Sequence, residues 1–258
     1  MLPAMALLAC LAAPANLAPN GGLEQLTDGW FSDWSRGWAR AGAEAFAADV
    51  STDRPHSGER CLHFRHTGGQ DWSINPGTPL TVKPGDILDL SVWIRMPGEG
   101  RVILCAWVHP PGTREQGVEW AAGAVVAPGP VPEWRQLKAT VVVADGMATA
   151  QPRLIGDGPV EAFADDFVVT SRGNLSELRA AYRGPARAVL ASRRLSVAVT
   201  AADGGLTVTV ARTGRKWQAA GAGSVVPRSA ERVGAGIALR VERVADGREL
   251  TLRFEVGR

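Results

Sequence analysis

The sequence predicts an all-β protein, with a jelly-roll β-sandwich followed by a second, smaller β unit. Short runs in which apolar and polar residues alternate with a period of two recur from Trp38 onward. The 30 glycines and 17 prolines separate these runs, and both residue types favour turns over helices. One segment, residues 174–182, has the pattern of a short helix.

The composition argues against nucleic-acid binding. The 258 residues carry a formal charge of +2, and the arginines are scattered along the chain. Proteins that bind nucleic acid concentrate basic residues in a patch, so no nucleic-acid partner is predicted. The unusual feature is tryptophan, because eight of the nine Trp lie between positions 30 and 134.

The first fifteen residues are predicted to be a signal peptide. They form a short apolar run that ends in Ala13-Pro14-Ala15, which fits signal-peptidase cleavage before Asn16. The run is too short to span a bilayer, so no transmembrane segment is predicted. Residues 7–10 also resemble a lipoprotein box, which makes Cys10 a candidate lipid anchor. We expect a secreted or cell-envelope protein.

The first domain is expected to span residues 16–171. In residues 87–96, Leu90, Val92 and Ile94 share one face while Ser91 and Trp93 share the other. The same alternation, weaker in the first run, predicts strands at residues 41–50, 60–66, 101–109, 134–143, 153–155 and 160–170.

Residues 172–187 are expected to be a linker with a short helix that Ser176 caps. The remaining residues, 188–258, are predicted to form the second β unit. Strict alternation returns there, with Asp203-Gly204-Gly205 and Thr213-Gly214-Arg215 as hairpin turns between strands.

The last strand of the first domain suggests a buried acid. Strict alternation places Phe163, Asp165 and Phe167 on the core face. A buried carboxylate must be paired, hydrogen-bonded or bound to a metal. Paired carboxylates suit Ca²⁺, so Glu24 and Asp165 are candidate ligands of a structural calcium ion. The alternative is that Asp165 accepts hydrogen bonds from backbone N–H groups in a tight turn.

Five motifs, in order, resemble carbohydrate-binding modules of the CenC type. They are residues 16–24 (NLAPNGGLE) with Trp30 and Trp34, Ser57-Gly58, residues 80–95 (LTVKPGDILDLSVWIR), Glu133-Trp134 and Asp165-Asp166-Phe167. The resemblance implies a galactose-binding-like β-jelly roll with a structural calcium and a sugar-binding cleft on its concave sheet. Leu23 and Leu88 depart from the family pattern, which has aromatic residues there.

A second resemblance concerns the end of the chain. Residues 195–218 (LSVAVTAADGGLTVTVARTGRKWQ) resemble the β-sandwich that precedes catalytic domains in some bacterial glycoside hydrolases. This implies a covalently linked downstream catalytic domain and a role as an accessory module of a glycoside hydrolase.

Tryptophans on outward faces are the candidate sugar contacts. Apolar C–H faces of sugars stack on flat rings, and sugar hydroxyls need amide, carboxylate or guanidinium partners. The candidate ligand-binding residues are Trp72, Trp93, Arg95, Trp107, His109, Gln70 and Arg153, with Gln151 as a further contributor. Trp30, Trp34, Trp38 and Trp134 are expected to be structural.

No catalytic residues are predicted in this chain. A glycosidase needs two carboxylates that flank the scissile bond, and the only recognisable pair, Asp165-Asp166, is accounted for by the closing strand. Cys61 and Cys105 are candidates for a disulfide in an exported protein, but their spacing does not decide it. The leading hypothesis is non-catalytic binding of a polysaccharide or oligosaccharide. The alternative is a structural, interdomain jelly roll of a cell-surface protein without sugar binding.

Overall fold

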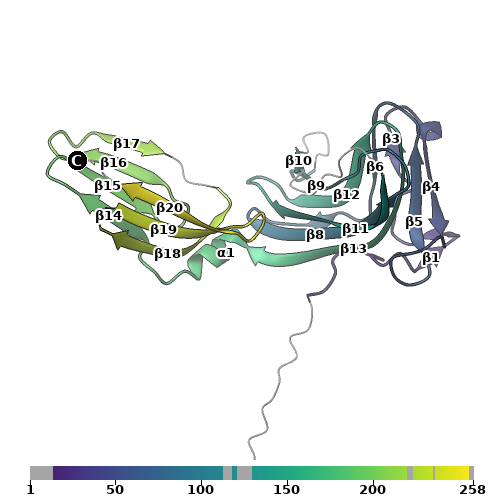
Figure 1. Ribbon diagram of the computed structural model, residues 1–258, viewed down its shortest axis with the longest axis horizontal. Helices are drawn as coiled ribbons and strands as arrows, with labels where there is room; N and C mark the ends of the chain where they lie inside the picture. The colour runs from purple at the N-terminus through teal and green to yellow at the C-terminus, as the bar shows by residue number, and fades with distance from the viewer. Residues whose placement is uncertain (1–13, 113–117, 121–129, 220–222, 235, 256–258) are drawn as a thin grey trace, which may run out of the picture.

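A computed structural model describes residues 14–112, 118–120, 130–219, 223–234 and 236–255. It contains two β-sandwiches side by side along the long axis of the molecule, with the short helix α1 (Leu175–Ala180) between them (Figure 1). The predicted all-β fold class is confirmed. No helix in these residues has the length and apolar character needed to cross a bilayer.

Two antiparallel sheets form the first sandwich. One has the strand order β10–β9–β12–β6–β3, with β7 also paired to β12, and the other has the order β11–β8–β13–β5–β4. The strands of these sheets are β3 (Trp38–Ala39), β4 (Phe46–Ser51), β5 (Cys61–His66), β6 (Asp71–Ile74), β7 (Leu80–Thr81), β8 (Asp86–Met96), β9 (Ile103–His109), β10 (Val118–Trp120), β11 (Val131–Val142), β12 (Thr149–Asp157) and β13 (Val160–Asn174). Two further strands, β1 (Leu26–Thr27) and β2 (Trp30–Phe31), pair with each other in a separate two-stranded sheet. A 3₁₀ turn, η1 (Ala43–Ala45), precedes β4.

The core lies between these two sheets. On β8, Leu90, Val92 and Ile94 are fully buried, and they belong to the same apolar cluster as Phe64 of β5 and Leu104 of β9. The alternation predicted for β8 is therefore confirmed, with Ser91 and Trp93 on the outer face. Each sheet consequently has one inner face, which the core fills, and one outer face, whose side chains are available to a ligand.

A β-bulge interrupts β13. The register of β13 on β8 shifts between Asp165 and Val168, and Asp166 has a positive φ of 49°. A one-residue bulge reverses the side-chain alternation. Ala162 and Ala164 face the core before the bulge, and Phe167 and Val169 face it afterwards. The predicted core orientation of Phe163 and Asp165 is therefore wrong, because strict alternation does not hold across the bulge.

The segment before β1 closes the sandwich on β13. The Asn16 amide donates to the Phe167 carbonyl (2.9 Å) and accepts from the Val169 N–H (2.8 Å). The Phe167 N–H donates to the Gly21 carbonyl at 2.7 Å. A Cβ atom at Gly21 would collide with the Phe167 carbonyl oxygen, which explains the glycine. Backbone groups that the bulge releases from the sheet ladder are thus satisfied by the first residues of the domain.

The second sandwich is smaller. Its sheets have the orders β14–β15–β16–β17 and β18–β19–β20, and Leu190, Val199, Leu239 and Val241 lie in its core. Both predicted hairpin turns are present, between β15 and β16 and between β16 and β17. The strands are β14 (Arg187–Ala191), β15 (Leu195–Thr200), β16 (Leu206–Val210), β17 (Lys216–Ala219), β18 (Val225–Val233), β19 (Gly236–Arg243) and β20 (Glu249–Glu255).

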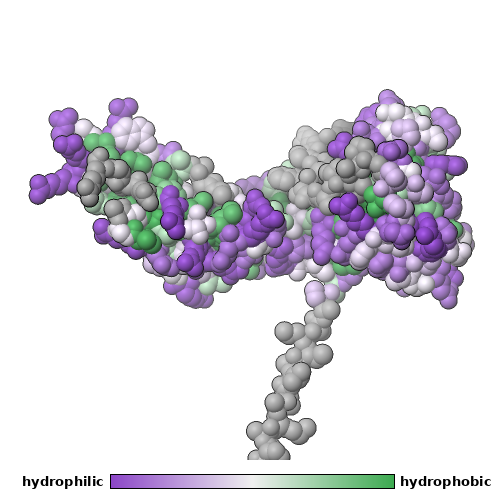
Figure 2. Space-filling model, in the orientation of Figure 1, coloured by the Kyte–Doolittle hydropathy of each residue, from purple (hydrophilic) through white to green (hydrophobic). Residues whose placement is uncertain are grey.

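The two sandwiches meet at a narrow waist, which Figure 2 shows between the two lobes. A small apolar cluster joins Ile87 and Leu175 to Val226 and Val244 of the second sandwich. Arg172 at the end of β13 donates to the Val244 carbonyl at 2.9 Å. The helix cap differs from the prediction, because the N-cap residue is Asn174, whose side chain accepts from the Ser176 N–H.

Replacing the Asn16 side chain should destabilise the first sandwich. Asn16→Ala removes hydrogen bonds to Phe167 and Val169, which join the first segment of the domain to its last strand. We expect a loss of about 2 kcal/mol in unfolding free energy. Urea unfolding of wild type and variant measures it. Gln25→Ala is the control, because Gln25 is exposed; equal stability of the two variants would contradict the role of Asn16.

Candidate functional site

One outer face gathers aromatic and charged side chains from four strands. Cross-strand partners share a face, and the register pairs Trp107 of β9 with Gln151 of β12, and Ser73 of β6 with both Ile155 of β12 and Trp38 of β3. We call this outer face of the β9–β12–β6–β3 sheet the platform. Its aromatic and charged side chains include those of Trp38, Arg40, Asp71, Trp107, His109 and Arg153.

Trp107 forms the centre of one end of the platform. Its side chain is half-buried, and the guanidinium carbon of Arg153 lies 5.0 Å from the ring centroid. The His109 ring stands beside it, with centroids 5.2 Å apart. A cation over the ring and a neighbouring imidazole hold the indole in place, so it presents a fixed aromatic surface.

His109 offers an unused hydrogen-bond acceptor next to this surface. Its side chain is 7% exposed, and Nδ1 lies 3.1 Å from the Pro110 carbonyl oxygen. Because a carbonyl only accepts, Nδ1 carries the proton in the neutral ring, and Nε2 is then the acceptor. Nε2 is buried and has no partner among the described residues. A buried acceptor of this kind favours a hydroxyl donor.

The other end of the platform is Trp38 on β3. This side chain is 51% exposed, and the Arg40 guanidinium carbon lies 5.5 Å from its ring centroid. Arg40 also grips Asp71 with two hydrogen bonds of 2.5 and 2.8 Å. The strand spacing and the register offset place the two tryptophans about 20 Å apart across the sheet.

The platform carries two carboxylates that face each other across strands, but they lack the properties of a glycosidase pair. Asp71 of β6 pairs with Asp157 of β12. The hydrogen bond from Arg40 lowers the pKa of Asp71, and Asp157 is bound by Arg101 at 3.3 Å. Glycoside hydrolysis needs one carboxylic acid with a raised pKa. The arrangement therefore suits binding through stacking and hydrogen bonds.

The structure brings together three of the predicted ligand-binding residues, Trp107, His109 and Arg153. Gln151 is on the same face, but it is buried and donates to the Pro76 carbonyl. Gln70 lies in the exposed turn before β6, where its carbonyl accepts from the Gly158 N–H at 3.2 Å, and it is outside the platform.

Trp72 is a core residue, so its predicted sugar contact is wrong. It is 1% exposed and packs between Phe46 and Phe64, with ring centroids 5.8 and 5.1 Å away. A Cβ at Gly156 would collide with its ring, which shows how closely β12 covers it. Alternation across the short β6 places Trp72 inward and its neighbours Asp71 and Ser73 outward.

Trp93 and Arg95 stand on the outer face of the opposite sheet, so they cannot share a site with Trp107. The Trp93 ring stacks on His56, with centroids 4.0 Å apart. Arg95 is 3% exposed; it lies over the Phe163 ring at 3.9 Å and donates to Asp53 at 2.9 Å. Trp93 and Arg95 do face outward as the alternation predicts, but alternation along one strand does not show which sheet the strand joins.

Sequence reasoning missed Trp38 and Arg40. Trp30 and Trp34 are buried as expected, whereas Trp38, also expected to be structural, is half exposed. The sequence did contain an indication, because Trp38 and Arg40 are two residues apart and so share a face if the segment is a strand.

Glu24 and Asp165, the acidic residues expected to bind calcium, both accept hydrogen bonds from one loop. Asp165 is fully buried and accepts from the N–H groups of His56 (2.9 Å), Ser57 (3.1 Å) and Asp166 (2.7 Å). Glu24 accepts from two N–H groups at the other end of the same loop, those of Glu59 and Arg60. This is the backbone arrangement considered as the alternative for Asp165. The described residues contain no group of three or more His, Cys, Asp or Glu side chains that could hold a metal.

Burial raises the pKa of Asp165 to about 6, and the charge of Asp166 adds to the effect of burial. Cys61 lies nearby as a buried free thiol, and burial together with the Asp165 charge raises its pKa to about 11. Cys61 is in β5 and Cys105 in β9, on different sheets, and no disulfide joins them.

Comparison with known proteins finds no matching family model and no matching curated protein. Several solved structures are similar to the first sandwich. The CBM22-1 xylan-binding domain of Xyn10C from Paenibacillus barcinonensis is 16% identical, with 58% of this chain and 90% of that one covered and a TM-score of 0.42. A family 16 carbohydrate-binding module is 14% identical, with 60% of this chain and 99% of that one covered and a TM-score of 0.40.

A third similar structure, TmCBM61 in complex with β-1,4-galactotriose, is 20% identical, with 60% and 97% of the chains covered and a TM-score of 0.36. These three similar structures are carbohydrate-binding modules, the class that the sequence motifs resemble. Identities and TM-scores this low say nothing about what this chain binds, and that question rests on the platform residues.

The raised pKa of Asp165 should make stability depend on pH. Between about pH 4 and pH 6 the folded protein holds a proton that the unfolded chain releases, so unfolding free energy falls as pH rises. Asp165→Asn removes this titration. The wild type should lose about 2 kcal/mol relative to the variant over this range, measured by urea unfolding at several pH values. Parallel pH profiles of the two proteins would contradict it.

Proposed function

We propose that the first sandwich is a non-catalytic carbohydrate-binding module that holds an oligosaccharide on the platform. The observation that carries this proposal is Trp107, a half-buried indole on an outer sheet face with Arg153 over its ring and His109 beside it. Isolated exposed tryptophans are common, but one held in place among hydrogen-bonding groups matches what a sugar ring needs.

Each platform group has a role in such binding. The apolar C–H face of a sugar ring stacks on Trp107. The unpartnered Nε2 of His109 accepts a hydrogen bond from a sugar hydroxyl. Asp71 and Arg40, already paired with each other, lie beside Trp38 and offer acceptors and donors to further hydroxyls.

The spacing favours a chain of sugars over a single one. Trp107 and Trp38 lie on different strands at opposite ends of the platform, about 20 Å apart. One monosaccharide cannot reach both rings, so a ligand that uses both must be an oligosaccharide or a segment of polysaccharide. Xylan and β-1,4-galactan fragments, the ligands named for two of the similar structures, are the first probes.

The wider setting is also a proposal. The apolar leader supports export to the outside or the cell envelope, with cleavage before Asn16 or lipid attachment at Cys10. The second β unit supports a place beside a downstream catalytic domain of a glycoside hydrolase. The competing function is a structural spacer without sugar binding, which the burial of Trp72 and the covering of Trp93 by His56 favour.

A structural calcium ion at Glu24 and Asp165 remains a prediction from the family resemblance. The contacts fit such an ion poorly, because both carboxylates face backbone N–H groups where calcium needs oxygen ligands. The proposed sugar binding does not depend on it. Thermal unfolding in EDTA and in added Ca²⁺ decides the question: a bound ion predicts a lower melting temperature in EDTA, and an unchanged one rules the ion out.

Removing the Trp107 ring should abolish most of the sugar binding. Trp107→Ala deletes the stacking surface, and we expect at least a tenfold loss of affinity, corresponding to about 1.4 kcal/mol or more. Trp38→Ala should lower the affinity for long oligosaccharides and leave the affinity for short ones unchanged. Calorimetry with xylan and galactan fragments measures both effects.

The second sandwich supplies the control. Trp217 is 49% exposed, close to the 51% of Trp38, and it also has an arginine near its ring. Trp217→Ala should leave binding unchanged. Absence of binding by folded wild type to any glycan in a broad panel would refute the proposed function and favour the structural spacer.

A further inference from the structure

A separate hollow of about 560 Å³ lies where the two sandwiches meet. Its floor is the outer face of β8, β11 and β13, on the sheet opposite the platform. Its far wall is Ala245 and Asp246, in the turn between β19 and β20. We call it the junction pocket. Its volume is that of a site for a small ligand, and both sandwiches are needed to build it.

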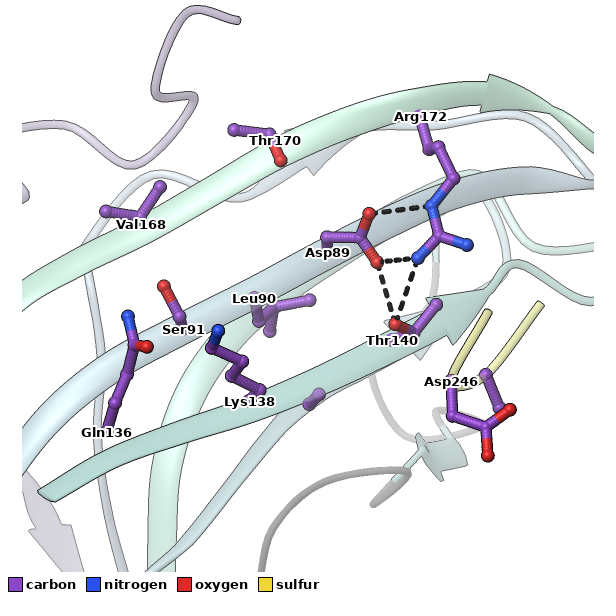
Figure 3. A pocket seen from close by; sticks show the side chains of 12 residues that line it. Asp89, Leu90, Ser91, Gln136, Lys138, Thr140, Val168, Thr170, Arg172 and Asp246 are labelled. Atoms are coloured by element: carbon purple, nitrogen blue, oxygen red, sulfur yellow. Dashed lines mark hydrogen bonds and ion pairs between the residues drawn. The ribbon is translucent and has the colours of Figure 1, made fainter. Parts of the chain in front are cut away.

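One end of the junction pocket is fixed by ionic contacts (Figure 3). Arg172 grips both carboxylate oxygens of Asp89, and the Thr140 hydroxyl donates to Asp89 at 2.7 Å. Arg172 also donates to the Val244 carbonyl at 2.9 Å, which holds the β19–β20 turn against the first sandwich. The wall of the pocket is therefore positioned by the same residue that lines it.

The floor carries polar side chains whose hydrogen-bonding capacity is unused. Among the described residues, the side chains of Ser91, Gln136, Lys138 and Thr170 have no hydrogen-bond or ion-pair partner. Figure 3 shows Ser91, Gln136 and Lys138 gathered at the end of the pocket away from Arg172. A hydroxyl, an amide and an ammonium group thus lie together, with the Thr170 hydroxyl further along the floor beside Asp89, and all four can bind a ligand.

The charged side chains of the lining, Asp89, Lys138, Arg172 and Asp246, sum to zero, but three of them are held in ion pairs. Asp89 is neutralised by Arg172. Asp246 is bound by Arg243 and by Arg248, the latter at 3.4 Å. Lys138 remains as the lining cation without an acidic partner among the described residues. An ammonium group beside hydroxyl and amide groups suits a ligand that has both a carboxylate and hydroxyls.

We propose that the junction pocket is a second carbohydrate site, specific for oligosaccharides that contain uronic acid. Lys138 binds the carboxylate, and Ser91, Gln136 and Thr170 bind the hydroxyls. Trp93, directly opposite Gln136 across β11 and β8, provides an aromatic neighbour held by its stack on His56. The ligand lies on a sheet face, where side chains and not backbone groups are presented, which favours a sugar over a peptide strand.

The test compares an oligogalacturonide with its methyl ester, which has the same sugars without the charge, by calorimetry on the full chain. We expect the acid to bind and the ester to bind at least tenfold more weakly. Lys138→Met should lower the affinity for the acid at least tenfold, because it removes a charge-assisted hydrogen bond. Lys216→Met, an exposed lysine on β17, is the matched control for non-specific attraction of anions and should change nothing.

The outcomes distinguish this site from the platform. Trp107→Ala should leave oligogalacturonide binding intact, so failure of platform binding would not affect this test. Equal binding of acid and ester, or equal losses in the Lys138 and Lys216 variants, would overturn the proposal. Competition by inorganic phosphate or by a poly-glutamate peptide at matched concentration would overturn the assignment to acidic sugars.

Discussion

The architecture of the first sandwich depends on the bulge in β13. At Asp165 and Asp166 the strand gains one residue, which turns Asp165 away from the core and lets Phe167 and Val169 fill it. Such a bulge leaves backbone groups without ladder partners. Asn16 and Gly21, at the start of the domain, supply those partners. The first and last segments are therefore joined by the irregularity itself.

The bulge also decides which outer face is free. Asp165 holds the N–H groups of His56 and Ser57, and the loop that contains them covers Trp93 with the His56 ring. The outer face of that sheet is occupied near the bulge and opens again only at the junction pocket. On the platform, Trp38 is not covered in this way and is 51% exposed. The proposed placement of a ligand on the platform thus follows from how the domain closes.

The sequence was informative where local patterns decide the outcome. The alternation of apolar and polar residues predicted the strands and the inner face of β8. The glycines in the hairpin turns predicted where β15, β16 and β17 begin and end. Sequence reasoning failed at β13, where strict alternation predicted a core orientation for Asp165 because nothing in the residue types announces a bulge. It also merged Trp93 and Trp107 into one site, since the assignment of strands to sheets depends on long-range pairing. Trp38 was missed because its strand has only two residues.

The central claim is that neutral oligosaccharides bind over Trp107 and Trp38 on the platform, and not over Trp93 on the opposite sheet. Titration of protein labelled at the indole nitrogens with a xylan or galactan oligosaccharide, followed by NMR, tests it directly, because each tryptophan gives its own N–H resonance. The resonances of Trp107 and Trp38 should move together, while those of the buried Trp30, Trp34 and Trp72 stay in place. Movement of the Trp93 resonance with those of Trp107 and Trp38 unchanged would contradict the claim.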